Sequence, residues 1–294
     1  MPDPQNPKVV LVTGSSSGFG LLIAARLSPQ HIVYASLRNP NKKQDLLAEV
    51  ERRGGKVHVL PLDVTDHASI RSAVNGIEHE QGRIDVLVNN AGYGVGGFFE
   101  DLSDQDIRKQ MEVNFFGVQN VTRVVIPIMR KQGKGKIINL SSVSGFQANA
   151  CFGAYSASKW ALEAFSESLH YELKLFGLDV HLVEPGTYRT RIFHENARYA
   201  ENFDNPLSPY YPISQFLRRR VMDYVENCRK DPETIARLVE RIIERPGAPF
   251  RNIPDLEGKM LFALRRILPF RFYSWIVRKA LFTGLQEARY PSPN

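Results

Sequence analysis

The sequence is poor in cysteine and contains no long apolar run. Only two of its 294 residues are cysteines, Cys151 and Cys228, too few for a disulfide framework and without metal-ligand spacing. No run of about 18 apolar residues is present, so no transmembrane helix is expected, and the N-terminal residues lack the pattern of a secretory signal. The seven histidines show no paired spacing typical of a metal site. These absences predict a metal-free protein of a reducing, cytoplasmic compartment.

Acidic residues are missing from one segment near the C-terminus. Between Gly258 and Phe282 there are six Lys or Arg residues and no Asp or Glu, whereas the other 32 of the 38 Lys and Arg residues are balanced by 31 acidic residues. The net charge of +7 therefore belongs mainly to a basic C-terminal extension, at about 256–294. A nearly neutral main body gives no sign of a nucleic-acid partner.

Apolar, β-branched runs alternate with helical patterns along the first 186 residues. Continuous apolar runs are typical of strands buried on both faces of a parallel sheet. We therefore expect an α/β fold: a single-domain, Rossmann-type, doubly wound parallel sheet of about seven strands with helices on both faces. The strands are predicted at 8–12, 31–37, 56–64, 84–90, 135–142, 178–186 and 250–254. The helices are predicted at about 18–28, 41–53, 66–82, 103–131, 153–176 and 231–244.

The pattern changes after Gly186, where the sequence becomes aromatic and is interrupted by prolines. We interpret about 187–230 as an irregular insertion that covers a binding cleft, because long loops in compact domains are commonly functional. Its aromatic residues suggest an apolar pocket. A surface loop whose aromatic side chains only pack on the body is the alternative.

A glycine-rich turn connects the first predicted strand to the first predicted helix. In VVLVTGSSSGFG, Gly14, Gly18 and Gly20 permit a tight turn and let backbone N–H groups approach a pyrophosphate at a helix N-terminus. After the second strand, the sequence has Arg38 and no acidic residue before Asp45. A carboxylate there is typical of NAD sites, whereas an arginine accommodates the 2′-phosphate of NADP. We therefore predict that NADP(H) is preferred over NAD(H).

Tyr155 and Lys159 open the helix predicted at 153–176. Four residues apart, they share one helix face, and on an arbitrary helix such a pair is commonly an incidental contact. A free phenol has a pKa near ~10, and a nearby ammonium group lowers it. The pair can therefore also be an acid/base and the group that tunes its pKa.

Several short motifs decide between these interpretations. They are TGSSSGFG (13–20), LDV (62–64), NNAG (89–92), VNFFG (113–117), LSSVSG (140–145), YSASK (155–159) and PG (185–186). By their order and spacing, over roughly residues 8–190, the chain resembles the short-chain dehydrogenases/reductases. Through VYASLRNP and the extended C-terminus it is similar to the branch that includes 17β-hydroxysteroid and retinol dehydrogenases.

The resemblance implies an oxidoreductase that interconverts a ketone or aldehyde and an alcohol by hydride transfer. Tyr155 is then the general acid/base, and Lys159 lowers its pKa and binds the nicotinamide ribose. Ser142 stabilises the substrate oxygen, and Asn114 holds a water in a proton relay. The implied cofactor-binding residues are Gly14, Ser15, Ser16, Ser17, Gly18, Phe19, Gly20, Arg38, Asp63, Val64, Asn90, Ala91, Gly92, Tyr155, Lys159, Pro185, Gly186, Thr187 and Thr190.

The substrate and the partners are predicted more coarsely. We expect a lipophilic carbonyl or alcohol compound, such as a steroid, a retinoid or a keto-lipid. Met260, Leu261, Leu264, Ile267 and Leu268 fall on one face of a basic helix, which can lie on an anionic membrane, pack on its own domain or meet a second subunit. Relatives are commonly homodimers or homotetramers, often through helices such as those at 103–131 and 153–176.

Other functions fit the same fold. A non-enzymatic NADP(H) sensor is one, although such proteins often lack the tyrosine or the lysine that this chain keeps. A 3-oxoacyl reductase and an epimerase or dehydratase of nucleotide sugars are others. Ser16 lacks the context of a hydrolase nucleophile, so a serine hydrolase is not expected.

Overall fold

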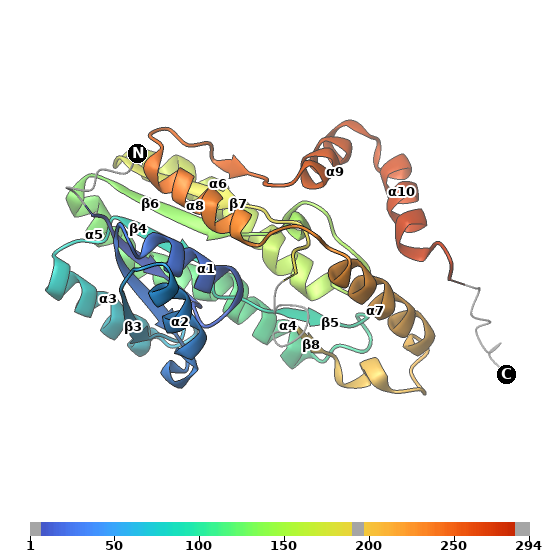
Figure 1. The fold of residues 1–294 in the computed structure, drawn as a ribbon. Helices are drawn as coiled ribbons and strands as arrows, with labels where there is room; N and C mark the ends of the chain where they lie inside the picture. Colours follow the sequence, from blue (N-terminus) through green and yellow to red (C-terminus); the bar gives the residue numbers. More distant parts are fainter. Residues whose placement is uncertain (1–6, 190–196, 286–294) are drawn as a thin grey trace.

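The computed structural model of the chain describes residues 7–189 and 197–285, and its centre is a twisted parallel sheet (Figure 1). The seven strands lie in the order β3-β2-β1-β4-β6-β7-β9, and each neighbouring pair is parallel. In chain order they are β1 (Val9–Val12), β2 (Ile32–Leu37), β3 (Val57–Pro61), β4 (Val86–Asn89), β6 (Gly135–Leu140), β7 (Leu178–Val183) and β9 (Arg251–Asn252). The predicted doubly wound sheet, with its seventh strand from 250–254, is confirmed.

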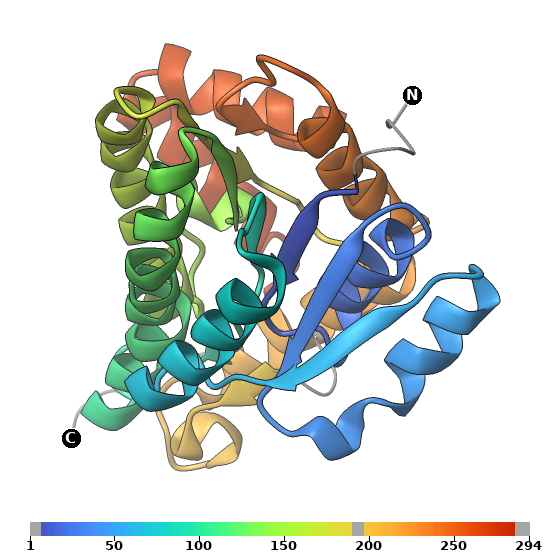
Figure 2. The same ribbon diagram turned by 90° about the vertical axis from the view of Figure 1, so that its left-hand side faces the viewer.

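Helices cover both faces of this sheet, as Figure 2 shows from the side. One face carries α1 (Gly18–Leu27), α2 (Gln44–Arg52) and α8 (Glu233–Glu244), which pack together on one core cluster. The other face carries α3 (His67–Gln81), α5 (Gly117–Gln132) and α6 (Gly153–Lys174) around a second cluster. Side chains of β1 alternate between the two clusters, because successive residues of a strand point to opposite faces.

The helix predicted over 103–131 is interrupted in the structure. It consists of α4 (Asp104–Met111), a π-helical turn at Glu112–Phe116, and α5. A capping box opens α4, with the Ser103 side chain accepting from the N–H of Asp106 at 3.1 Å. The π turn adds a residue to the helix at the position of Asn114, which the sequence pattern did not reveal.

The insertion at about 187–230 is more regular than predicted. Among the described residues it contains α7 (Tyr211–Glu226) and the short strand β8 (Ala197–Tyr199), which pairs in parallel with β5 (Gly94–Gly96). The prolines misled the prediction, because Pro212 lies in the first turn of α7, where its ring is compatible with a helix. The insertion therefore covers the end of the sheet with a helix.

The C-terminal extension forms two helices that project beyond the sheet (Figure 1). They are α9 (Leu256–Ile267) and α10 (Phe270–Phe282). Of the predicted apolar face of α9, Leu261, Leu264 and Leu268 are half-buried, whereas Met260 and Ile267 are exposed. No helix in the described part of the chain has the length and apolar content needed to cross a membrane.

A buried amide network holds the middle of the sheet to the helices beneath it. The Asn89 side chain donates to Thr122 Oγ1 on α5 at 3.0 Å and to Asn139 Oδ1 at 2.9 Å. Asn139 in turn donates to Ser166 Oγ on α6 at 2.8 Å. All four side chains are almost fully buried, so the network fixes β4 and β6 relative to α5 and α6.

Replacing Asn139 by leucine is expected to lower the free energy of unfolding by about 1–3 kcal/mol, because buried groups of Asn89 and Ser166 each lose a partner. Urea unfolding followed by circular dichroism measures the change. The exposed Lys131→Ala is the control and is expected to stay within about 0.5 kcal/mol of the original protein. Equal stability of Asn139→Leu and the original protein would contradict the structural role of the network.

Candidate functional site

A cavity of about 1360 Å³ opens at the carboxyl ends of the strands, where doubly wound sheets bind their ligands. Its walls come from the loops after β1, β2, β3, β4, β6 and β7, from the start of α6, and from α7 and α10. Residues far apart in the sequence therefore meet in one space. Its two ends differ in character: one is built from glycine and polar backbone, the other from apolar and charged side chains of α7 and α10.

The glycine turn after β1 forms one wall of this cavity, and contacts with Asn90 and Ala91 hold its backbone in place. Gly14 has φ +70°, and a Cβ atom there would come within 2.7 Å of the Ala91 Cα. The Asn90 side chain donates to the carbonyl oxygens of Thr13 at 3.0 Å and Gly14 at 2.9 Å. Gly18, with φ +59°, opens α1 and faces space in which a Cβ would meet nothing within 4 Å. The turn thus leaves a cradle at a helix N-terminus, which fits a pyrophosphate.

Most predicted cofactor residues line this one cavity, and a few do not. Those that line it are Gly14, Ser16, Ser17, Gly18, Phe19, Arg38, Asp63, Val64, Asn90, Ala91, Gly92, Tyr155, Lys159, Pro185, Gly186 and Thr187. The hydroxyl of Ser15 is buried and donates to the Val12 carbonyl at 3.1 Å. Gly20 lies behind the turn, where a Cβ would collide with Asn90 and the Gly14 carbonyl. Thr190 lies outside the described residues.

Cationic side chains gather at the end of the cavity next to β2. Arg38 follows the last residue of β2, is exposed, and makes no ion pair within the described ranges. Lys42, four residues further along the chain, also lines the cavity. Asp63 lines the same cavity, where its Oδ1 accepts from both the N–H and the hydroxyl of Thr65, and it forms no ion pair with Arg38 or Lys42. This end of the cavity can therefore hold an anionic group.

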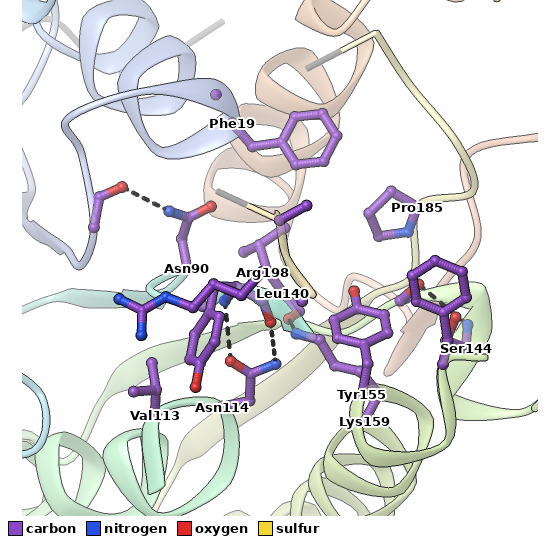
Figure 3. Close-up of a pocket in the computed structure, with 18 of the residues that line it drawn as sticks. Phe19, Asn90, Val113, Asn114, Leu140, Ser144, Tyr155, Lys159, Pro185 and Arg198 are labelled. Carbon is purple, nitrogen blue, oxygen red and sulfur yellow. Dashed lines mark hydrogen bonds between the residues drawn. The ribbon is translucent and has the colours of Figure 1, made fainter. Parts of the chain in front are cut away.

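Tyr155 and Lys159 rise from α6 into the cavity, with Pro185 and Asn114 on opposite sides of them (Figure 3). The phenol of Tyr155 is hydrogen-bonded to the Ser142 side chain, which also accepts from the N–H of Ser144 at 3.1 Å. Burial raises the pKa of Tyr155 above its ordinary value, and the Ser142 contact opposes that rise. Tyr155 is therefore protonated at neutral pH, the form that gives a proton to a carbonyl oxygen.

The Lys159 ammonium group is buried beneath the tyrosine. Its Nζ donates to the Leu140 carbonyl oxygen at 2.7 Å and lies 5.8 Å from the centroid of the Tyr155 ring. Burial lowers the pKa of Lys159 to about 8, and the negative charge of Glu163 opposes the shift. In this structure burial dominates the pKa of Tyr155, so the lowering expected from Lys159 does not set the direction of the shift.

Asn114 lines the cavity from the π turn, but its side chain is occupied by the protein. Its amide donates to the Tyr93 carbonyl at 3.0 Å and to Ser158 Oγ at 3.3 Å, and its Oδ1 accepts from the Tyr93 N–H at 3.1 Å. Both N–H groups of the amide are therefore engaged. π turns occur frequently at functional sites, and this one sets the Asn114 backbone beside the cavity.

A buried ionic cluster below the tyrosine–lysine pair was missed by the sequence interpretation. The Arg251 guanidinium on β9 donates to Glu163 at 2.7 Å and also to Glu184. Burial raises the pKa of both carboxyl groups, and the Glu163 charge raises that of Glu184 further. Glu163 lies one helical turn after Lys159, so its i, i+4 spacing was a signal that could have found it.

The opposite end of the cavity is formed by α7 and α10, with Arg220 and Asp223 beside its apolar side chains, and its residues were also missed. Leu217 and Val221 of α7 line it together with Leu281 of α10. The loop after β7 is held by Asp255, the residue directly before α9. Its carboxylate accepts from the Gly186 N–H at 3.0 Å and from the Tyr188 hydroxyl at 2.8 Å. No short motif marks these positions, because they are brought together by helix packing.

The sheet order, the cradle at α1 and the buried tyrosine together define a Rossmann-type protein whose cavity can hold a dinucleotide beside an acid/base. Comparison with protein families is in agreement: the model described as short chain dehydrogenase matches residues 8–200. The chain belongs to the short-chain dehydrogenase/reductase family. It is an oxidoreductase of the class that acts on alcohol and carbonyl groups.

Similar proteins share most of the chain. A 3-ketodihydrosphingosine reductase from Bacteroides thetaiotaomicron is 40% identical over 87% of this chain and 91% of its own length. Retinol dehydrogenase 8 of Homo sapiens is 40% identical over 89% of this chain and 86% of its own. A short-chain dehydrogenase/reductase from Burkholderia phymatum, solved with NAD, is 26% identical with a TM-score of 0.76 and covers 89% of this chain and 93% of its own. Actinorhodin polyketide ketoreductase, solved with NADPH, is 29% identical with a TM-score of 0.70 and covers 86% and 97%.

Lys159→Met is expected to raise the free energy of unfolding at neutral pH by roughly 1–3 kcal/mol, because the folded protein then no longer buries a charge. Between pH about 8 and 10.5 the unfolded chain binds more protons at Lys159 than the folded protein does, so the stability of the original protein rises with pH there. The difference in the free energy of unfolding between the variant and the original protein should therefore become smaller across that pH range. Urea unfolding at several pH values measures it, and a variant that is less stable at pH 7 would contradict the burial cost.

Proposed function

We propose that this protein reduces a lipophilic ketone or aldehyde with NADPH, using Tyr155, Lys159, Ser142 and Asn114. The observation that carries the proposal is the continuity of one cavity, in which a protonated, buried tyrosine lies between a dinucleotide cradle and an apolar end. A nicotinamide cofactor supplies the hydride when bound. Solved relatives contain NAD or NADPH, which supports a nicotinamide cofactor here.

In the proposed reaction, the chain supplies a proton and fixes the carbonyl oxygen. The Ser142 hydroxyl and the Tyr155 hydroxyl, already in contact with one another, together bind that oxygen, and Tyr155 gives it a proton. Lys159 stabilises the phenolate that remains, since its positive charge lies under the same ring. Because the Asn114 side chain is occupied, we propose that the backbone at the π turn, rather than its amide, holds the water that returns a proton towards Lys159.

Tyr155→Phe is expected to lower kcat by about 10²–10⁴-fold, because the acid is lost while the cavity keeps its shape. NADPH binding, measured by fluorescence titration, should change little. Tyr171→Phe on the exposed side of α6 is the matched control and should keep full turnover. Unchanged kcat in Tyr155→Phe would overturn the catalytic assignment.

The preference for NADPH is proposed from the charges beside β2. Arg38 and Lys42 line the cavity at the place where dinucleotide folds hold the adenosine ribose, and no carboxylate follows β2 directly. Arg38 is not used in an ion pair within the described ranges, so its guanidinium is available for a 2′-phosphate. A phosphate is recognised well by the planar fork of an arginine.

Arg38→Ala is expected to raise the KM for NADPH by about 10–100-fold, the range of one charge-assisted hydrogen bond to a charged group. The KM for NADH should change much less, so the ratio of kcat/KM for the two cofactors moves towards NADH. Arg123→Ala, an exposed arginine on α5, should leave the ratio unchanged. Equal effects of Arg38→Ala on both cofactors would exclude the phosphate role.

The lipophilic substrate is proposed from the apolar end of the cavity. Leu217, Val221 and Leu281 give this end apolar walls, beside which α7 also places Arg220 and Asp223. The names of the relatives, a ketodihydrosphingosine reductase and a retinol dehydrogenase, support the same class. An NADPH-oxidation screen of ketosteroids, retinal and 3-keto lipids tests it, and turnover confined to small polar sugars would contradict it.

We also propose that the whole chain is a single oxidoreductase domain. We further propose that it forms a homo-oligomer through the helices α4, α5 and α6. Trp160 and Tyr171 are exposed on α6, and Phe116 is exposed at the π turn, which supports an apolar contact there. A cytoplasmic location stays a prediction from the cysteine content.

A further inference from the structure

The two C-terminal helices leave large apolar side chains in contact with water. On α9, Leu256 is 74% exposed and Ile267 76%; on α10, Phe270, Phe272 and Trp275 are 66%, 61% and 58% exposed. Single exposed apolar residues are ordinary on protein surfaces, whereas a continuous group marks an interaction site. We call this group, with Met260 and Ile276, the C-terminal apolar face.

Apart from Phe270, which lies in the first turn of α10 on the same side as Tyr273, this face is the side of each helix that points away from the body. On α10, Phe272, Trp275 and Ile276 share one side, whereas Tyr273 and Leu281 lie on the other. Tyr273 is buried, and its hydroxyl donates to Gln147 at 2.9 Å, while Leu281 lines the cavity. The inner side of α10 is therefore committed to the body, and the outer side has no partner within the described ranges.

Basic side chains border the C-terminal apolar face on both helices. Lys259 and Arg266 are exposed on α9, and Arg271 and Arg278 on α10. The Lys279 ammonium lies 4.7 Å from the centroid of the Trp275 ring. No acidic residue occurs between Gly258 and Phe282. An apolar stripe with an aromatic residue and a purely basic border matches the surface of an anionic bilayer.

The same charge argues against a second copy of this chain as the occupant. A symmetric dimer would bring two purely basic borders together, and like charges across an interface weaken it. An anionic lipid surface instead supplies the opposite charge to each cation. The charge pattern therefore favours lipid over a second subunit.

The inner side of α10 links the C-terminal apolar face to the site. The Arg220 guanidinium on α7 donates to the carbonyl oxygens of Ala280 at 3.0 Å and Thr283 at 2.6 Å, which fastens the end of α10 to α7. Phe282 packs with Leu217 in a small apolar cluster. Arg220 and Leu281 both line the cavity. A bilayer at the outer side of α10 would thus lie one helix away from the apolar end of the cavity.

We propose that the C-terminal apolar face docks on an anionic lipid bilayer, and that the substrate reaches the cavity from that bilayer along α7 and α10. Phe272 and Trp275 enter the interface between headgroups and acyl chains, and Arg271 and Arg278 contact the lipid phosphates. The route for the substrate rests on the proposed function, a lipophilic carbonyl compound; the docking itself does not.

Co-sedimentation with vesicles tests the docking. The full chain is expected to sediment with mixed phosphatidylcholine/phosphatidylglycerol vesicles at low salt, to be released as salt rises, and to bind phosphatidylcholine alone weakly. Phe272→Ser/Trp275→Ser and, separately, Arg271→Glu/Arg278→Glu should each weaken binding by about tenfold or more, since each border cation is worth about 1 kcal/mol. Leu175→Ser, just after α6, and Lys131→Glu/Lys134→Glu, at the end of α5 and just after it, change exposed sites; they are matched controls and should bind as the original protein does.

Tryptophan fluorescence shows whether α10 is the part of the chain that touches the vesicles. The chain has two tryptophans, so in a Trp160→Phe background the emission reports Trp275 alone, and it should shift to the blue when anionic vesicles are added. Absence of vesicle binding, or binding that the face variants leave unchanged, overturns the docking. A face variant that lowers the mass seen by light scattering, in a protein that does not bind vesicles, also overturns it in favour of a second copy.

Turnover separates this proposal from the proposed function. The face variants should reduce a small, water-soluble ketone at the original rate, and lose the stimulation by anionic vesicles when the ketone is lipid-dissolved. Vesicle binding by a protein that reduces no lipophilic ketone would remove the substrate class and leave the docking in place. Reduction of lipid-dissolved ketone without vesicle binding would remove the docking and leave the substrate class in place.

Discussion

The burial of the Lys159 ammonium group is the constraint on which the rest of the site depends, because the contacts that hold this group also position β6 and α6. Its hydrogen bond goes to the Leu140 carbonyl, the last residue of β6, so the end of a central strand sets its position. One residue earlier, Asn139 ties the same strand to Asn89 on β4 and Ser166 on α6. The lysine, its helix and its strand are thus joined by buried polar contacts, which are costly to break.

A second group of buried charges lies one helical turn beyond the lysine. Arg251 on the edge strand β9 is shared by Glu163 of α6 and Glu184 at the end of β7. Burial raises the pKa of both carboxyl groups, and at Glu163 the positive charges of Arg251 and Lys159 oppose that rise. The guanidinium groups of Arg251 and Arg266 lie 4.9 and 4.6 Å from the centroid of the Phe262 ring of α9. The C-terminal part of the chain is in this way connected to the underside of the site.

The parts that the sequence predicted well are those that local backbone chemistry determines. The glycine turn needs positive φ at Gly14 and Gly18, a demand that leaves a visible signature in the sequence. The strands are continuous apolar runs because both faces of the sheet are covered. The π turn at Asn114 and the helix α7 left no such signature. The first depends on contacts with Tyr93 from another loop, and α7 begins among prolines that are compatible with a first turn.

The two ends of the cavity therefore differ in how the sequence specifies them. At the cofactor end, backbone N–H groups, glycines and short polar contacts such as Asn90 to Gly14 fix the shape, so few residue types are compatible with it. At the substrate end, apolar side chains of α7 and α10 meet by helix packing, and many apolar residues fill such a space equally well. Because no buried polar contact of Lys159 passes through α7 or α10, changes at Leu217 or Leu281 can alter which carbonyl compound fits without moving the acid/base. In the function that we propose, buried polar groups hold the acid/base in place, and the packing of α7 and α10 selects the substrate.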